Sequence, residues 1–185
     1  MNTVKRSLLF GLYSVFFMAF LGACCSLKNE QKETLNAFLA EREAVQKHIE
    51  TFDALDFDVY SDQEWDRLRE SHAENIVVYY PDGSTTTGLA DHIAELKKTF
   101  VFAPDTRVTQ HPIKTGSGKY TAVIGVAEGT FTKPMPIGNG KFIKPTNKKY
   151  KYSFATFSVW ENGVMTEEYL FWDNQAFMKQ IGVIK

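Results

Sequence analysis

The sequence predicts an α+β fold in which a curved, mostly antiparallel sheet wraps around a long N-terminal helix. Helical patterns gather in the first half of the folded region, and strand patterns gather in the second half. Such segregation of helices and antiparallel strands is typical of α+β layers. A tight hairpin is expected at Asn162-Gly163, because both residues tolerate the positive φ of a type I′ turn.

The N-terminal segment has the pattern of an export signal. Lys5 and Arg6 precede an uncharged apolar run, Leu8 to Leu21, which suits a secretory signal core and is short for a bilayer span. The next residues complete Leu21-Gly22-Ala23-Cys24, which resembles the bacterial lipobox, where the lipidated cysteine becomes the first mature residue. An uncleaved membrane anchor is the alternative.

We therefore expect a lipoprotein signal peptide over residues 1–23, a polar tether over 24–32 and one domain over 33–185. Lipidation of Cys24 would hold the protein at the bacterial cell envelope, on the periplasmic side or in the outer membrane. The only other cysteine is Cys25, so the domain has no disulfide, zinc cluster or catalytic thiol.

The charge of the mature chain argues against a nucleic-acid-binding function. Removal of residues 1–23 takes away Lys5 and Arg6 and no acid, so the formal charge moves from −1 to −3. Nucleic-acid binding would need a basic face.

The first predicted helix of the domain runs from Glu33 to about Leu55. Its apolar residues recur mostly at spacings of three, four or seven, which is typical of an amphipathic helix with one buried face. They are Leu35, Phe38, Leu39, Val45, Ile49, Phe52 and Leu55.

Short elements follow this helix. Asp62 to Leu68 begins with an acidic turn and predicts a second, short helix. The β-branched and aromatic run Ile76 to Tyr80 predicts a strand, which the turn Pro81 to Ser84 ends. Gly88 to Phe100 has apolar residues at helical spacing and predicts a third helix.

The second half of the domain reads as strands around one long loop. We expect strands at 106–114, 119–131, 150–160 and 164–172, a loop rich in Gly, Pro and Lys at 134–149, and a terminal helix at 174–182.

The chain resembles the SnoaL-like polyketide cyclases of the nuclear transport factor 2-like superfamily. The resemblance runs from about Asp66 to Gly182. The matching segments are His72 to Gly83, Gly88 with the helix after it, Ala103 to Val108, Gly129 to Phe131, Pro136 to Gly140, Val159 to Gly163, Glu167 to Tyr169, and Trp172 to Gly182.

This resemblance implies a cone-shaped α+β barrel with a hydrophobic cavity, often dimeric through the outer face of the sheet. In the cyclases an acid in the cavity removes a proton beside a carbonyl, and the enolate closes a ring without metal or organic cofactor. The resemblance carries that acid onto Asp173. Relatives often have another acid three residues earlier, where this chain has Leu170.

The residues of the last strand support two interpretations of Asp173. An acid at the mouth of an aromatic cavity is poorly hydrated, which raises its proton affinity toward that of a general base. Alternatively, Asp173 is the N-cap of the following helix. Alternation places Glu168, Leu170 and Trp172 on one face of the strand and Tyr169, Phe171 and Asp173 on the other, so Trp172 and Asp173 cannot both enter the cavity unless the strand ends or bends there.

Proton abstraction also needs a hydrogen-bond donor for the oxyanion and a dry site. The candidate donors are Tyr80, His111, Tyr152 and Tyr169, and the candidate apolar walls are Phe154, Phe171 and Trp172. His111 lies inside a predicted strand, where a structural cross-strand histidine is the alternative to a catalytic one. The four histidines have no ligand spacing, so the sequence predicts no metal site.

Two functions from different classes remain. The first is a lipid-anchored envelope protein whose cavity binds a small hydrophobic molecule, in a chain that can form a homodimer. The second is a cofactor-independent cyclase or isomerase with Asp173 as the general base.

Overall fold

The computed structural model describes residues 3–185, with side chains described from residue 28 onward. The expected signal peptide and Cys24 lie outside the residues with described side chains. The chain divides into two compact units, Met1–Arg42 and Glu43–Lys185. Helix α1 (Thr3–Ala54) makes up the first unit and continues into the second. Within residues 28–185, no helix is both long enough and apolar enough to cross a membrane.

The second unit contains the remaining elements in the predicted order. They are η1 (Leu55–Tyr60), η2 (Trp65–Glu70), β1 (His72–Tyr79), β2 (Thr85–Thr87), α2 (Leu89–Phe102), β3 (Arg107–Ser117), β4 (Tyr120–Thr130), β5 (Met135–Pro136), β6 (Phe142–Ile143), β7 (Lys149–Glu161), β8 (Val164–Trp172) and α3 (Asn174–Gln180). The expected short helix is a 3₁₀ turn, η2, and the expected Gly/Pro/Lys loop holds the two-stranded ribbon of β5 and β6.

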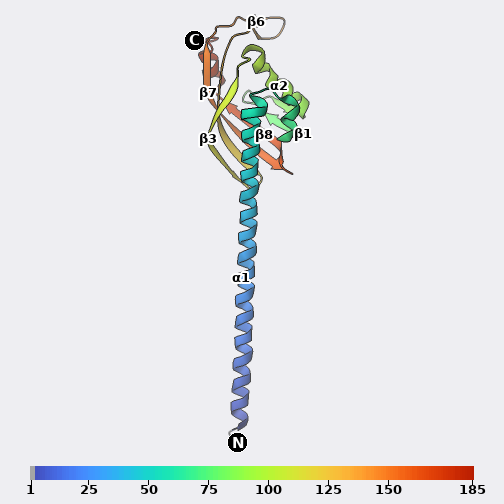
Figure 1. Ribbon diagram of the computed structural model, residues 1–185, viewed down its shortest axis with the longest axis vertical. Coiled ribbons are helices and arrows are strands. Elements are labelled where there is room, and N and C mark those ends of the chain that lie inside the picture. Colours follow the sequence, from blue (N-terminus) through green and yellow to red (C-terminus); the bar gives the residue numbers. More distant parts are fainter. Residues whose placement is uncertain (1–2) are drawn as a thin grey trace. The chain divides into compact units, whose positions relative to one another are not determined.

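Six strands form one sheet, in the order β2-β1-β8-β7-β4-β3. All neighbouring strands are antiparallel except β1 and β8, which are parallel. The long strands β3 and β7 are visibly bowed (Figure 1). Asn162 and Gly163 have φ values of 52° and 85° between β7 and β8, which confirms the predicted hairpin turn. The predicted α+β class, with a curved and mostly antiparallel sheet, is confirmed.

The C-terminal end of α1 is fixed to the sheet by aromatic packing. The His48 ring stacks on Trp160 at 4.6 Å, and Trp160 donates a hydrogen bond from Nε1 to Thr121 Oγ1 at 2.8 Å. These contacts centre on a buried apolar cluster. Its members are Phe52, Leu55, Val59, Leu68, Ile76, Val78, Leu89, Val123, Trp160 and Met165.

The buried face of α1 is shorter than the sequence pattern predicts. Leu35, Phe38 and Leu39 are each more than half exposed, at 54%, 53% and 52%. Burial begins instead with Ile49 and Phe52. In the unit Glu43–Lys185 the buried face of α1 is formed by Ile49 and Phe52, whereas Leu35, Phe38 and Leu39 belong to the other unit.

A glycine gives the inner face of the sheet room for a large ring. Gly125 on β4 pairs with Phe154 on β7, and a Cβ added at Gly125 would lie 2.1 Å from the Phe154 ring. Because that distance is far below van der Waals contact, only glycine lets this ring lie flat on β4. The aromatic side chain thus becomes part of the concave wall described next.

Candidate functional site

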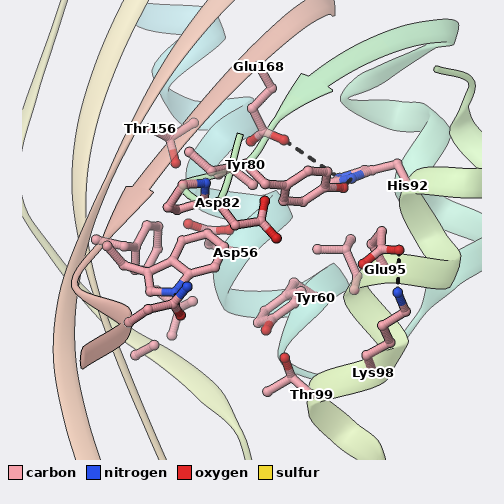
Figure 2. A pocket seen from close by; sticks show the side chains of 18 of the residues that line it. Asp56, Tyr60, Tyr80, Asp82, His92, Glu95, Lys98, Thr99, Thr156 and Glu168 are labelled. Atoms are coloured by element: carbon pink, nitrogen blue, oxygen red, sulfur yellow. Dashed lines mark hydrogen bonds and ion pairs between the residues drawn. The ribbon is translucent and has the colours of Figure 1, made fainter. Parts of the chain in front are cut away.

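A cavity of about 270 Å³ lies between the sheet, η1 and α2. Figure 2 shows its polar side chains converging from these elements. Its lining comes from every layer of the second unit. The residues are Leu55, Asp56, Tyr60, His72, Tyr80, Pro81, Asp82, Ser84, His92, Glu95, Leu96, Lys98, Thr99, Val108, Ala127, Tyr152, Phe154, Thr156, Glu168, Leu170, Trp172 and Asn174.

Strand β8 decides which C-terminal side chains reach this cavity. Glu168, Leu170 and Trp172 all line it, so this alternate set faces inward. Leu170 is apolar where relatives often carry an acid, and the carboxylate on this face is Glu168, two residues earlier. The sequence left open whether Trp172 or Asp173 enters the cavity, and the structure shows that Trp172 does.

Four of the six expected ligand-binding residues line the cavity: Tyr80, Tyr152, Phe154 and Trp172. Tyr80 contacts polar groups, since its hydroxyl lies 2.9 Å from His92 Nδ1 and 3.1 Å from Thr86 Oγ1. Burial raises the pKa of Tyr80 to about 12, so this hydroxyl keeps its proton and can donate it to a ligand oxygen.

Tyr169 and Phe171 lie on the opposite face of β8, which corrects their expected place in the cavity. The Tyr169 ring stacks on Tyr79 at 4.4 Å, and its hydroxyl donates to Glu167 Oε2 at 2.6 Å. Phe171 packs against Phe157 at 5.9 Å, and both rings are about half exposed. The reason is the two-residue period of the strand.

Asp173 does not line the cavity, although Trp172 and Asn174 on either side of it do. Its Oδ1 accepts a hydrogen bond of 2.8 Å from Ala176 N, and Asp173 is the N-cap of α3. The capping interpretation is confirmed. The expected position of Asp173 inside an aromatic hollow is corrected, because the strand ends at Trp172 and the exposed carboxylate points to the helix.

His111 does not line the cavity. Its ring lies between two carboxylates, those of Asp56 and Asp53. Its Nε2 is 2.8 Å from Asp56 Oδ2, and its Nδ1 is 2.7 Å from Asp53 Oδ1. Asp56 itself lines the cavity and has an 11% exposed side chain. Its hydrogen bond to Asp56 thus connects His111 to the cavity.

The pKa values of Asp56 and His111 are raised above their ordinary values, whereas that of Asp53 is lowered. Burial raises the pKa of Asp56 and outweighs its hydrogen bond to His111. Burial lowers the pKa of His111, but Asp56 and Asp53 outweigh burial, and its net pKa is raised. For Asp53, burial raises the pKa less than His111 and Lys114 lower it. Asp56 is therefore the carboxyl whose proton affinity moves toward the range of a general base.

A second cluster of polar side chains lines the same cavity and consists of Glu168, His72 and His92. Glu168 Oε2 lies 3.6 Å from His92 Nε2, the contact drawn in Figure 2, and 3.7 Å from His72 Nε2. Burial raises the pKa of Glu168, but His72 and His92 outweigh burial and leave it below the ordinary value. Burial lowers the pKa of His92 to about 4, so its imidazole is neutral at neutral pH.

Sequence reasoning missed Glu168, His92, His72 and Asp56 as cavity residues. For Glu168 a signal was present, because it shares the inward face of the last strand with Trp172. The two histidines are separated along the chain, yet their ring centroids are 5.1 Å apart. Only packing of α2 against β1 brings them together, so spacing could not reveal the cluster.

Family and structure comparisons agree with this fold. The family described as SnoaL-like polyketide cyclase matches residues 52–181. No curated protein sequence matches the chain significantly.

Solved structures from several bacteria share the architecture. A candidate SnoaL-like polyketide cyclase from Jannaschia sp. CCS1 is 21% identical, with a TM-score of 0.65 over 76% of this chain and 94% of that protein. IdmH, a candidate polyketide cyclase from Streptomyces antibioticus, is 21% identical, with a TM-score of 0.61 over 73% and 98%.

A third neighbour carries a different fold description. It is a Catenulispora acidiphila DSM 44928 protein with a ketosteroid isomerase-like fold, in complex with trimethylamine. It is 15% identical, with a TM-score of 0.59 over 72% of this chain and 92% of that protein. At these identities the three structures show a shared fold.

Proposed function

Because the chain belongs to the SnoaL-like polyketide cyclase family, we propose that it binds a small, largely apolar molecule in this cavity while a lipid on Cys24 holds it at the bacterial cell envelope. The observation that carries the binding proposal is the cavity of about 270 Å³ enclosed by sheet and helices. Ligand pockets are usually concave and mostly apolar, with a few convergent polar groups.

The chemistry of the walls supports a specific ligand class. Tyr152, Phe154 and Trp172 supply aromatic surface, whereas Tyr80 supplies a hydroxyl that stays protonated. A molecule with one or two rings and a carbonyl or hydroxyl group matches both the volume and these contacts. Glu168 and Asp56 border the cavity, and Lys98 in its lining pairs with Glu95, so a neutral ligand is favoured over an anionic one.

The envelope part of the proposal is supported by the N-terminal pattern. Lys5, Arg6 and the apolar run before Leu21-Gly22-Ala23-Cys24 are what lipoprotein export requires. A binding protein at the envelope meets molecules that cross or leave the membrane.

The outer face of the sheet supports a homodimer as part of the same proposal. Ile113, Tyr120, Phe157 and Phe171 are each more than half exposed, at 56%, 57%, 51% and 52%. Exposed apolar side chains on one face mark an interaction surface. Sedimentation of the wild type should give a dimer, and Phe171→Glu should give a monomer; a wild-type monomer would contradict this part.

A fluorescent aromatic ketone of the naphthalene class tests binding. Ala127→Trp places a large ring in the cavity opposite Tyr152, its partner in the β4–β7 register. Ala155→Trp is the matched control, because Ala155 pairs with the outward residue Phe171. We expect fluorescence enhancement with the wild type and with Ala155→Trp, and a loss of at least about tenfold in affinity with Ala127→Trp.

Equal binding by all three proteins would contradict the proposal, because the ring of Ala127→Trp would displace a ketone bound inside the cavity. Circular dichroism of both variants checks that they fold. Loss of binding in Ala155→Trp alone would contradict it as well.

Acid–base turnover is a second candidate function, and the buried Asp56–His111–Asp53 series favours it. Asp56 borders the cavity with a raised pKa and is held at Oδ2 by His111 Nε2 at 2.8 Å. Such a carboxyl would act as the base in place of Asp173, with His111 as its positioning residue. Figure 2 shows Tyr60 and Tyr80 bordering the same space as Asp56.

Proton abstraction would use only side chains that border the cavity and the ligand itself. The Asp56 carboxylate takes the proton from carbon beside the ligand carbonyl, and the C–H electron pair moves to form an enolate. A protonated tyrosine hydroxyl donates a hydrogen bond to the enolate oxygen. Return of the proton at the far carbon of a conjugated enolate gives an isomer. Attack of the enolate carbon on a second carbonyl of the same molecule closes a ring, and the alkoxide so formed takes the proton back from Asp56.

Deuterium exchange at the carbon beside the ketone carbonyl tests this candidate. We expect exchange by the wild type, none by Asp56→Asn, and unchanged exchange by Asp173→Asn. Binding of the ketone by Asp56→Asn shows that the cavity persists. Absence of exchange in the wild type, or equal exchange in Asp56→Asn, would exclude Asp56 as a base for this ketone.

A further inference from the structure

We propose that His72, His92 and Glu168 form a binding site for one divalent first-row transition ion, of the class of Zn²⁺ or Fe²⁺, in the wall of the cavity. The three residues come from β1, α2 and β8. The proposal goes beyond small-molecule binding and stands whichever organic ligand the cavity takes.

The spacing of the three side chains suits ligands of a single ion. One ligand atom from each residue can be chosen so that all lie within 4.8 Å of one another. The two imidazole Nε2 atoms are 3.7 and 3.6 Å from Glu168 Oε2. Two ligands at about 2.0–2.1 Å from a tetrahedral ion are about 3.4 Å apart, so the two histidine–glutamate distances need only a small contraction.

The far nitrogen of each histidine ring is held by other groups. His72 Nδ1 lies 2.9 Å from Ser71 Oγ and 3.3 Å from Leu68 O. His92 Nδ1 lies 2.9 Å from the Tyr80 hydroxyl. Metal-binding histidines typically engage the second nitrogen in this way, which fixes the ring and leaves the first nitrogen for the ion.

The nitrogen that His72 presents to Glu168 has no hydrogen-bond partner in the described part of the chain. Its side chain is 1% exposed, and 3.7 Å to the carboxylate is too long for a hydrogen bond. His72 Nε2 therefore faces the buried Glu168 carboxylate without a hydrogen bond, an arrangement that a cation between them would stabilise.

The charge around Glu168 leads to the same conclusion. Its side chain is 5% exposed, and no ion pair among the described residues joins it to a lysine or arginine. Lys98, the cationic side chain in the lining, pairs with Glu95 instead. Buried carboxylates are normally paired with a cation or bind a metal.

The donor set indicates the class of ion. Two imidazoles and one carboxylate suit zinc in three-ligand sites and iron(II) in sites with open positions. All three residues border the cavity, so the open positions would face the space that a small molecule occupies. A ligand carbonyl or hydroxyl oxygen could therefore complete the coordination.

Zn²⁺ titration of the chelator-treated full chain tests the proposal. By calorimetry we expect about one equivalent to bind, and His72→Gln, His92→Gln and Glu168→Gln each to weaken binding. Loss of an outer-shell partner alone typically costs about 10–100-fold, so loss of a ligand should cost at least as much. His48→Gln is the matched control, because His48 packs on Trp160 outside the cavity lining.

A second measurement uses the wild type alone, so it does not depend on whether the variants fold. Nitrogen NMR of the imidazoles should show Zn²⁺ shifting the Nε2 signals of His72 and His92, with those of His48 and His111 unchanged. Absence of stoichiometric binding, full binding by the three variants, or shifts confined to His48 or His111 would each overturn the proposal.

Discussion

At the scale of single residues, a cavity carboxylate and a helix cap lie only five positions apart, at Glu168 in β8 and at Asp173 after it. Glu168 lies on the inward face and is 4% exposed, whereas Asp173 follows the end of the strand and caps α3. Both are acids near aromatic rings in the sequence. Their surroundings differ because side chains alternate along a strand and the strand ends at Trp172.

Asp173 can be tested as a cap separately from its charge. Asparagine caps a helix about as well as aspartate, whereas alanine cannot accept the Ala176 N–H hydrogen bond. We expect Asp173→Asn to leave the free energy of unfolding nearly unchanged and Asp173→Ala to lower it by about 1 kcal/mol. Urea unfolding measures both, and equal loss in both variants would contradict the capping role.

His111 makes the stability of the domain depend on pH. Its pKa is raised above the ordinary 6.5, so its stabilisation is complete below that pH and is lost as pH rises through the folded-state value. The side chains that face it are Asp53 and Asp56, which accept its hydrogen bonds, and Phe52 and Phe57, which pack on its ring.

The two carboxyls shift stability in opposite senses. The raised pKa of Asp56 makes stability fall as pH rises above 3.8, whereas the lowered pKa of Asp53 makes stability fall as pH drops below that value. Comparison of the wild type with a His111 variant separates the contribution of the histidine from those of the two carboxyls.

We expect His111→Gln to cost more stability at about pH 6 than at about pH 8. Urea unfolding of wild type and variant at both values measures the difference. Parallel losses at the two pH values would show that His111 is not preferentially protonated in the folded protein.

At the scale of elements, two glycines of β4 leave room for two aromatic rings of β7. Gly125 accommodates the Phe154 ring, as Gly129 accommodates Tyr150, whose hydroxyl would lie 2.6 Å from an added Cβ. Tyr150 is held there by Thr106 Oγ1, 2.5 Å from its hydroxyl. These rings occupy the inner face because the opposing residue has no side chain.

Gly125→Ala should force the Phe154 ring away from β4. Overpacking of this kind typically costs about 1–3 kcal/mol. In Gly125→Ala/Phe154→Leu the smaller side chain removes the clash, so the double variant should lose less stability than the sum of the single losses. Urea unfolding of the three variants checks this, and additive losses would contradict the proposed contact.

The elements were largely predictable from the sequence, for local reasons. The Asn162-Gly163 turn, the apolar spacing of α2 and the aromatic alternation of β7 and β8 each act over a few residues. The candidate site was less predictable, because it depends on packing. His72 and His92 meet only when α2 lies against β1, and a hydrogen bond to Asp56 on η1 connects His111 to the cavity.

At the scale of the whole molecule, the proposed anchor and the cavity belong to different parts of the chain. The lipobox-like residues end at Cys24, whereas every cavity residue lies in the unit Glu43–Lys185. The two functions can therefore be changed independently.

Cys24→Ala should release the protein from the membrane fraction of its bacterial host and remove the mass of the attached lipid. Cys25→Ala is the matched control and should remain membrane-bound, because Cys25 would put Gly22 where the lipobox needs a branched apolar residue. Fractionation and intact-protein mass spectrometry measure both outcomes. Membrane association that persists in Cys24→Ala and is lost in Cys25→Ala would show that Cys25, and not Cys24, carries the lipid.

The central claim is that a small apolar molecule binds inside the concave face of the sheet. NMR mapping of the aromatic ketone on the labelled protein tests it most directly. We predict the largest amide shifts around Tyr152, Thr156 and Glu168, whose side chains line the cavity. Shifts confined to the outer-face residues Phe157 and Phe171, with the cavity residues unmoved, would contradict the claim.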